Sequence, residues 1–250
     1  MQRQDLAAII LAAGQGKRMQ SDLAKVLHPV LGRPMLDHVL DATRDAGVGR
    51  TIVIVGHQAD KVRAAMAGRG VEFALQAQQK GTGHAVLQAA PLLAEHTGQV
   101  LVLCGDTPLL TPETLTALLA THRETAAAAT VLTAELPDPT GYGRIVRDSG
   151  GAVRRIVEHK DATEAERQVH EINSGLFVFG TRDLFAALGR VGCDNAQGEY
   201  YLTDTLEILL REGKRVSAHR CPDPGEVVGV NTLEQLHAVE SAMRERSRHA

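Results

Sequence analysis

The stretch LAAIILAAGQGKRM, residues 6–19, decides the fold of this chain. Its first part, residues 6–13, is an apolar run, which is typical of a strand buried on both faces of a parallel sheet. Gly14 and Gly16 follow directly, and glycine lets the backbone turn sharply and approach a ligand closely. Peptide N–H groups in such a turn can bind phosphate oxygens. The stretch therefore predicts a strand that leads into a phosphate-binding loop.

The glycine loop differs from the two common nucleotide loops. No Ser or Thr follows Lys17, as a P-loop requires, and Met19 stands where the dinucleotide fingerprint has its third glycine. An ATPase and an NAD dehydrogenase are both disfavoured. Lys17, Arg18 and Lys25 could neutralise a triphosphate. The GxG pattern alone leaves open a plain glycine turn with solvated basic side chains.

Apolar runs alternate with helical patterns along the rest of the chain. Strands are expected at 6–13, 51–56, 100–104, 129–132 and 175–179. Helices are expected at 36–43, 83–94, 112–121, around Leu202, Leu206 and Leu209, and from Asn231 onward. This order predicts an α/β protein with a Rossmann-like, doubly wound, mostly parallel sheet and ligands at the carboxyl ends of the strands. We expect one domain over 1–250, with a hairpin or excursion at 137–151 and a less regular second half that closes over the substrate.

Composition excludes several classes of function. Aromatic residues make up 3% of the chain, there is no Trp, and the net charge is −3, so neither base stacking nor a global basic field favours nucleic acid. The three cysteines form no CxxC pair, and the histidines show no zinc-binding spacing. No apolar run reaches the length of a membrane helix. We expect a cytoplasmic protein that binds neither nucleic acid nor a membrane.

Eight ordered blocks give the chain a family resemblance. They are LAAGQGKRMQSDLAKVLHPVLGRPML (11–36), QAQQKGTGHAV (76–86), CGDTPLL (104–110), DPTGYGRIVRD (138–148), IVEHKDAT (156–163), EINSGLFVF (171–179), NAQGEYYLTD (195–204) and VVGVN (227–231). The chain resembles the sugar nucleotidyltransferases, and more narrowly the N-terminal uridyltransferase domain of the bifunctional N-acetylglucosamine-1-phosphate uridyltransferase/glucosamine-1-phosphate acetyltransferases. The blocks cover nearly the whole chain, so the resemblance is specific.

The resemblance implies a reaction and a site. UMP would pass from UTP to N-acetylglucosamine 1-phosphate with Mg²⁺ as cofactor, giving UDP-N-acetylglucosamine, a cell-wall precursor, and pyrophosphate. Arg18 and Lys25 would be catalytic, and Asp106 and Asn231 would hold the metal. The backbone of Leu11, Ala12, Ala13 and Gly14 would line the nucleotide site, and Gln76, Gly81 and Thr82 would recognise uracil. The sugar pocket would comprise Gly143, Glu158, Asn173, Glu199 and Tyr201.

Taken singly, several of these residues have simpler explanations. Asp106 could be a turn former, Asn231 could cap the last helix together with Glu234, and Thr82 could cap the helix after it. Cys104 is expected in the core. The ordered blocks favour the functional assignments over these alternatives.

The chain departs from the family pattern at a few places. Ala24 stands where Pro is usual, Lys17 where Thr is usual, and Cys104 where an aromatic residue is usual. No hexapeptide repeats of a left-handed β-helix occur, so we expect no acetyltransferase activity from this chain. Another sugar or base, a non-catalytic nucleotide-sugar-binding module and a scaffold remain alternatives. The sequence alone defines neither the oligomeric state nor whether this is a standalone enzyme or an excised domain.

Overall fold

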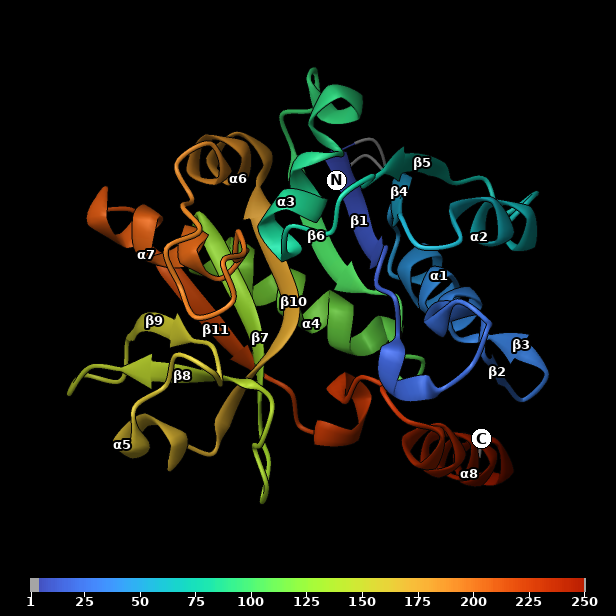
Figure 1. Ribbon diagram of the computed structural model, residues 1–250. Coiled ribbons are helices and arrows are strands. Elements are labelled where there is room, and N and C mark those ends of the chain that lie inside the picture. The colour runs from blue at the N-terminus through green and yellow to red at the C-terminus, as the bar shows by residue number, and fades with distance from the viewer. Residues whose placement is uncertain (1–4, 250) are drawn as a thin grey trace.

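A twisted sheet forms the middle of the molecule in the computed structural model, which describes residues 5–249 (Figure 1). Its main strands are β1 (Leu6–Ala12), β4 (Arg50–Val55), β5 (Glu72–Leu75), β6 (Gln99–Cys104), β7 (Ala129–Glu135), β10 (Glu171–Gly180) and β11 (Val216–Arg220). Their order is β11-β7-β10-β6-β1-β4-β5. β1 pairs in parallel with both β4 and β6, whereas β10 runs antiparallel to β6 and β7. The predicted doubly wound, mostly parallel sheet is therefore confirmed, with β10 as the exception.

Helices cover both faces of this sheet. They are α1 (Met35–Asp45), α2 (Ala59–Ala65), α3 (Thr82–Leu87), α4 (Pro112–Glu124), α5 (Glu164–Arg167), α6 (Thr181–Leu188), α7 (Asp204–Arg211) and α8 (Leu233–His249). Side chains of α1, α2 and α4 share one apolar core with the sheet, and those of α3, α6 and α7 share the other. Alternate residues of β1 enter each core, for example Ile9 and Ile10, which is why its sequence is apolar throughout.

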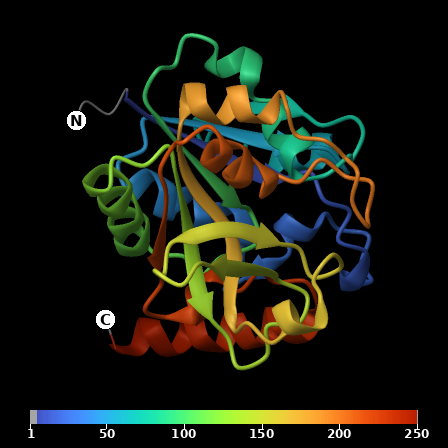
Figure 2. The ribbon, with the colours of Figure 1, turned by 90° about the vertical axis from the view of Figure 1, so that its left-hand side faces the viewer.

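The second half contains the excursion that the sequence predicted. β8 (Gly143–Arg147) and β9 (Val153–Val157) form an antiparallel hairpin, and β8 pairs with β10. Figure 2 shows this hairpin crossing in front of the long strands of the main sheet. The less regular half thus faces the carboxyl ends of the parallel strands from one side.

Three helix expectations need correction in detail. Leu202, which was expected in a helix with Leu206 and Leu209, lies in the turn before α7, because α7 begins at Asp204. The helix expected at 83–94 is split into α3 and a short 3₁₀ helix, η4 (Ala90–Leu93). Pro91 lies in the first turn of η4, and proline cannot continue a helix because it lacks an N–H and clashes with the preceding turn. The last helix begins at Leu233 and not at Asn231. No helix within residues 5–249 is long and apolar enough to cross a membrane.

The shorter elements complete the chain. They are β2 (Pro29–Val30), β3 (Arg33–Pro34), and the 3₁₀ helices η2 (Lys17–Met19), η3 (Lys25–Leu27) and η5 (Pro224–Val227). α8 packs through Leu236 and Val239 against Val30, Met35 and Leu109, in a third small core. This contact brings the segment before α8 back to the carboxyl edge of the sheet, close to the glycine loop.

Candidate active site

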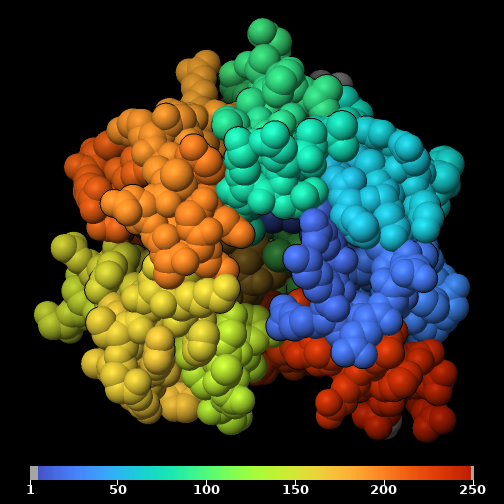
Figure 3. Space-filling model, viewed as in Figure 1, coloured from blue at the N-terminus to red at the C-terminus, as the bar shows by residue number. Residues whose placement is uncertain are grey.

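A cavity of about 290 Å³ lies at the carboxyl ends of β1, β5 and β6. Figure 3 shows the molecule hollowed at this place, between the blue N-terminal loop, the teal segment around residue 80 and the orange segment around residue 195. The cavity is lined by Leu11, Ala12, Ala13, Gly14, Lys25, Val26, Gln76, Gln79, Gly81, Thr82, Ala85, Cys104, Asp106 and Glu199. The position is the one expected for a ligand in an open parallel sheet, where strand ends meet at one edge.

The glycine loop forms one wall of this cavity. Gly16 has φ +60°, and a Cβ placed on it would lie 2.7 Å from the Cβ of Lys25. A side chain at this position would therefore collide with the stem of Lys25. Because Gly16 has no side chain, the loop can pack against the stem of Lys25. Lys25 and Gly14 both line the cavity.

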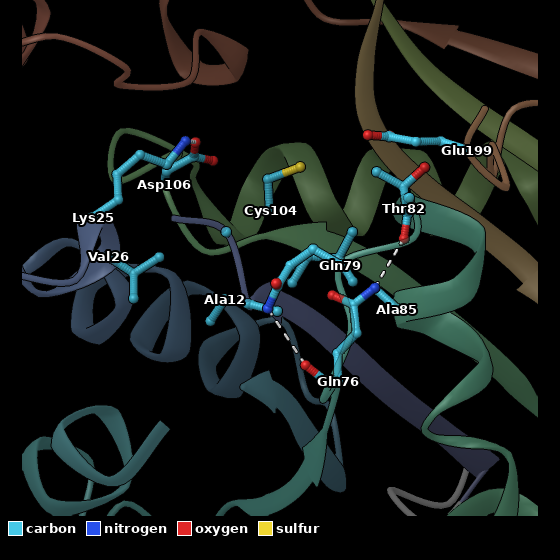
Figure 4. Close-up of a pocket in the computed structure, with 14 residues that line it drawn as sticks. Ala12, Lys25, Val26, Gln76, Gln79, Thr82, Ala85, Cys104, Asp106 and Glu199 are labelled. Atoms are coloured by element: carbon cyan, nitrogen blue, oxygen red, sulfur yellow. Dashed lines mark hydrogen bonds and ion pairs between the residues drawn. The ribbon is translucent and has the colours of Figure 1, made fainter. Parts of the chain in front are cut away.

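Lys25 joins two of the predicted site residues. Its ammonium forms an ion pair with Asp106 and donates a hydrogen bond to Asn231 Oδ1 at 3.1 Å. The three residues come from η3, from the turn after β6 and from the segment before α8, more than eighty positions apart at each step. Figure 4 shows Lys25 and Asp106 meeting at one end of the cavity.

The oxygen atoms of Asp106 and Asn231 suit a divalent cation. They converge on a single positive group, the Lys25 ammonium, so a cation can bind to both at once. Among residues 5–249 no group of three or more His, Cys, Asp or Glu side chains could hold a metal. Mg²⁺ commonly takes one or two protein oxygens and completes its shell with water and substrate phosphates. The residues present therefore fit Mg²⁺ brought in with a nucleotide.

The alternative reading of Asn231 as a helix cap is wrong. Thr232 caps α8, because its hydroxyl accepts a hydrogen bond from the N–H of Gln235 at 3.2 Å. Gln235 Oε1 in turn accepts hydrogen bonds from the N–H groups of Asn231 and Thr232. Thr232 and Gln235 therefore form a capping box. This box lies one residue after the pair Asn231 and Glu234 that the sequence suggested. The side chain of Asn231 is thereby free to face Lys25.

Gln76, Gly81 and Thr82 lie together at the other end of the cavity. Gln76 Nε2 donates to the Gly81 carbonyl oxygen at 3.1 Å (Figure 4). Thr82 does not cap α3; its hydroxyl accepts from the N–H of Leu202 at 3.0 Å. Two further backbone bonds, from Gly83 N to Tyr200 O and from Tyr200 N to Lys80 O, bind the same two segments together. The loop predicted to bind the base is therefore tied to the loop that carries Glu199.

The predicted sugar residues come from the second half of the chain. Gly143 and Asn173 are direct partners in the β8–β10 pair. Glu158 accepts a hydrogen bond from the Thr203 hydroxyl at 3.0 Å. Burial, with the nearby carboxylates of Asp204, Asp161 and Glu199, raises the pKa of Glu158 despite this bond. Of this set, Glu199 lines the cavity itself.

Tyr201 is placed differently from the other sugar residues. It is buried, and its hydroxyl donates to Asp161 Oδ2 at 3.2 Å and accepts from Gln197 Nε2 at 2.9 Å. Asp161 Oδ1 also accepts from the N–H of Ala196 at 2.8 Å. Asp161 thus holds both ends of the 196–201 segment. Sequence reasoning missed Asp161, although it lies in the quoted block IVEHKDAT.

The remaining predicted residues and some unpredicted ones complete the site. Arg18 lies exposed in η2 and does not line the cavity. It makes no hydrogen bond or ion pair within the described part of the chain, so its charge is available to a ligand. Cys104 was expected in the core but is part of the cavity wall, because β6 ends there. Burial and the nearby Asp106 carboxylate raise the pKa of its thiol to about 12, so it stays protonated and is no nucleophile. Val26, Gln79 and Ala85 also line the cavity and were not predicted.

The sheet is doubly wound, and a glycine loop follows β1. At the carboxyl edge of the sheet lies a cavity with cationic and acidic groups. Together these features define a nucleotide-binding α/β protein. The chain belongs to the MobA-like NTP transferase domain family, whose model matches residues 8–200. The resemblance found in the sequence is borne out by curated relatives as well.

Proteins named bifunctional protein GlmU match nearly the whole chain. Those of Brevibacillus brevis and Geobacillus thermodenitrificans are 54% identical over 239 residues, which is 96% of this chain and 52% of each relative. That of Halalkalibacterium halodurans is 52% identical over 243 residues, 97% of this chain and 53% of the relative. The chain thus spans about half the length of these relatives. A crystal structure of UDP-glucose pyrophosphorylase complexed with UDP-glucose shares the fold, with a TM-score of 0.77 at 17% identity over 96% of this chain and 98% of that one.

Proposed function

We propose that this chain transfers UMP from UTP to N-acetylglucosamine 1-phosphate, forming UDP-N-acetylglucosamine and pyrophosphate. The observation that carries the proposal is the meeting of Lys25, Asp106 and Asn231 at one end of a cavity whose other end holds Gln76, Gly81 and Thr82. Phosphate chemistry at one end and base recognition at the other suit a nucleoside triphosphate. The printed name of the relatives, bifunctional protein GlmU, supports the same assignment.

The reaction needs positioning and charge neutralisation more than a protein nucleophile. A phosphate oxygen of the sugar 1-phosphate attacks the α-phosphorus of UTP, and the bond from that phosphorus to the bridging oxygen of the β-phosphate breaks. Both electrons of that bond leave with pyrophosphate. Lys25 and Arg18 stabilise the negative charge on the reacting centre and the leaving group. Asp106 and Asn231 would hold Mg²⁺, which when bound neutralises phosphate charge and keeps two anionic substrates together.

The second half of the chain would bind the sugar phosphate. Asn173 and Glu158 offer amide and carboxylate groups to hydroxyls and to an N-acetyl group, and Gly143 lies beside Asn173 in the same proposed pocket. Glu199 reaches the cavity from the segment held by Asp161. The chain would act in the cytoplasm, which agrees with the free thiols of Cys104, Cys193 and Cys221. We propose a single transferase domain over 1–250 and expect these residues alone not to acetylate glucosamine 1-phosphate.

Pyrophosphate release tests the proposal. The complete mixture holds UTP, N-acetylglucosamine 1-phosphate and Mg²⁺, and parallel mixtures omit the metal or replace the sugar phosphate or the base. Fast release in the complete mixture alone is expected. Release with another sugar or base would overturn the assignment of the pocket, and tight UDP-sugar binding without any release would support a binding module instead.

Asp161→Ala is expected to raise the KM for N-acetylglucosamine 1-phosphate about tenfold, because two hydrogen bonds to a carboxylate that hold the 196–201 segment are lost. The KM for UTP should change less than about threefold, since the metal and base ends of the cavity do not contact Asp161. Steady-state kinetics with each substrate varied in turn measures the split. Asp194→Ala is the matched control, because Asp194 lies exposed in the loop before this segment and makes no hydrogen bond or ion pair with residues 5–249. Equal rises in the KM for UTP and the KM for N-acetylglucosamine 1-phosphate would contradict the role of Asp161 in positioning the 196–201 segment for the sugar phosphate.

A further inference from the structure

Gln76 presents one defined end of its amide to the cavity. Its Nε2 lies 3.1 Å from the Gly81 carbonyl oxygen and 3.1 Å from His84 Nδ1. A carbonyl oxygen can only accept, so the group that faces Gly81 must be the amide nitrogen. Both amide protons then have acceptors, which leaves Oε1 as the group that a ligand meets. No hydrogen bond to Gln76 Oε1 comes from residues 5–249, and Figure 4 shows this oxygen turned away from Gly81.

His84 can serve as the second acceptor only as a neutral ring. It is partly buried on α3, with Lys80 and the ring of Tyr200 as neighbours, the latter at a centroid distance of 6.5 Å. Burial, and to a lesser extent the positive charge of Lys80, lower the pKa of His84. The neutral imidazole has one N–H and one acceptor nitrogen. Gln76 Nε2 lies 3.1 Å from Nδ1, whereas Gln88 Nε2 lies 3.4 Å from the other ring nitrogen and already donates to the His84 carbonyl oxygen at 2.9 Å. The shorter contact assigns Nδ1 as the acceptor.

We propose that His84 is a positioning residue that, together with the Gly81 carbonyl oxygen, holds the Gln76 amide so that only its oxygen faces the base, and that this orientation selects uracil over cytosine. The inference rests on the proposed function for the identity of the ligand. Uracil carries a proton on N3 and can donate it to Gln76 Oε1. Cytosine has a lone pair on N3 in the same place, which the amide oxygen repels. A site built to accept one hydrogen bond rejects the analogue that cannot donate it.

Two variants separate the acceptor of His84 from its ring. His84→Phe keeps a ring beside Tyr200 but has no acceptor. The Gly81 carbonyl oxygen is then the one remaining acceptor for the Gln76 amide nitrogen, so the amide turns its nitrogen toward cytosine at a lower cost than in the wild type. His84→Asn loses the ring but carries Oδ1 close to where Nδ1 lies. A second cavity of about 290 Å³, lined in part by His84, Leu87 and Tyr200, gives the phenyl ring room. His84→Ala, which also lacks the acceptor and adds no bulk, repeats the test if the Phe variant does not fold.

The measurement is the ratio of Kd values for UTP and CTP, obtained by titration calorimetry with Mg²⁺ for the wild type and each variant. The wild type should prefer UTP. In His84→Phe the ratio of the CTP Kd to the UTP Kd should be about tenfold smaller than in the wild type. In His84→Asn this ratio should stay within about threefold of the wild-type ratio. An unchanged ratio in His84→Phe, equal weakening of both nucleotides, or a wild type without preference would overturn the proposal. Pyrophosphate release is assayed separately, so selective UTP binding without turnover would contradict the proposed function and leave the role of His84 supported.

Discussion

Asp106→Ala is expected to lower the turnover number for pyrophosphate release by about 10²–10³-fold. Asp106 supplies the charged oxygen of the proposed metal site and is the ion-pair partner of Lys25. Without it Asn231 would be the sole protein ligand in that set, and the phosphates of the two substrates would repel each other with less compensation. The rate at saturating substrates, measured over a range of Mg²⁺ concentrations, should fall at every concentration and require more metal for its half-maximal value.

Asp60→Ala provides the matched control. Asp60 has the same side chain, lies on α2, and has 98% of its side chain exposed, with a surface ion pair to Arg63. Surface pairs contribute little, so this variant should keep the wild-type rate and metal dependence. Asp106→Ala with undiminished turnover in Mg²⁺ would remove the metal assignment.

Gly81→Ala is expected to cost about 3 kcal/mol of folding stability and to weaken UTP binding at least about tenfold. Gly81 has φ +105°, and a Cβ placed on it would lie 2.6 Å from Tyr200 O and 2.8 Å from Tyr200 N. These are backbone atoms, which cannot move aside as the end of a flexible side chain can. The new methyl group would push apart the base loop and the loop that carries Glu199. Chemical denaturation and UTP titration measure the two effects.

Gly192→Ala is the corresponding control for a glycine substitution. Nothing lies within 4 Å of a Cβ at Gly192, and its φ is not in the left-handed region. Both stability and UTP affinity should stay near the wild-type values. If Gly81→Ala matched this control, the close packing of the two loops would not be needed for nucleotide binding.

The general architecture could be predicted because it depends on local patterns. The apolar runs of β1, β4 and β6 and the cap formed by Thr111 before α4 can be read from adjacent residues. The antiparallel direction of β10 could not, because an apolar strand buried on both faces does not encode which neighbours it will meet. The division of the predicted 83–94 helix, in contrast, follows from a local signal, because Pro91 cannot continue a helix.

The residue types of the site could be predicted, but the contacts that orient them could not. Its residue types came from family-like blocks, and the fold brings Lys25, Asp106 and Asn231 together across more than two hundred positions. The contacts that orient these residues depend on tertiary structure. The bond from Gln76 to His84 and the two bonds from the 196–201 segment to Asp161 link polar residues of types that are common on protein surfaces. Their residue types alone therefore do not reveal these contacts. The shift of the α8 cap to Thr232 likewise required the hydrogen bonds themselves.

The most direct test follows the phosphorus atoms of UTP. UTP labelled at the α-phosphorus and UTP labelled at the γ-phosphorus are incubated separately with the protein, Mg²⁺ and N-acetylglucosamine 1-phosphate, and the products are separated. We predict that the α-label appears in UDP-N-acetylglucosamine and the γ-label in pyrophosphate, in equal amounts. Label released as inorganic phosphate, or an α-label that stays in UTP despite saturable binding, would contradict UMP transfer by this site.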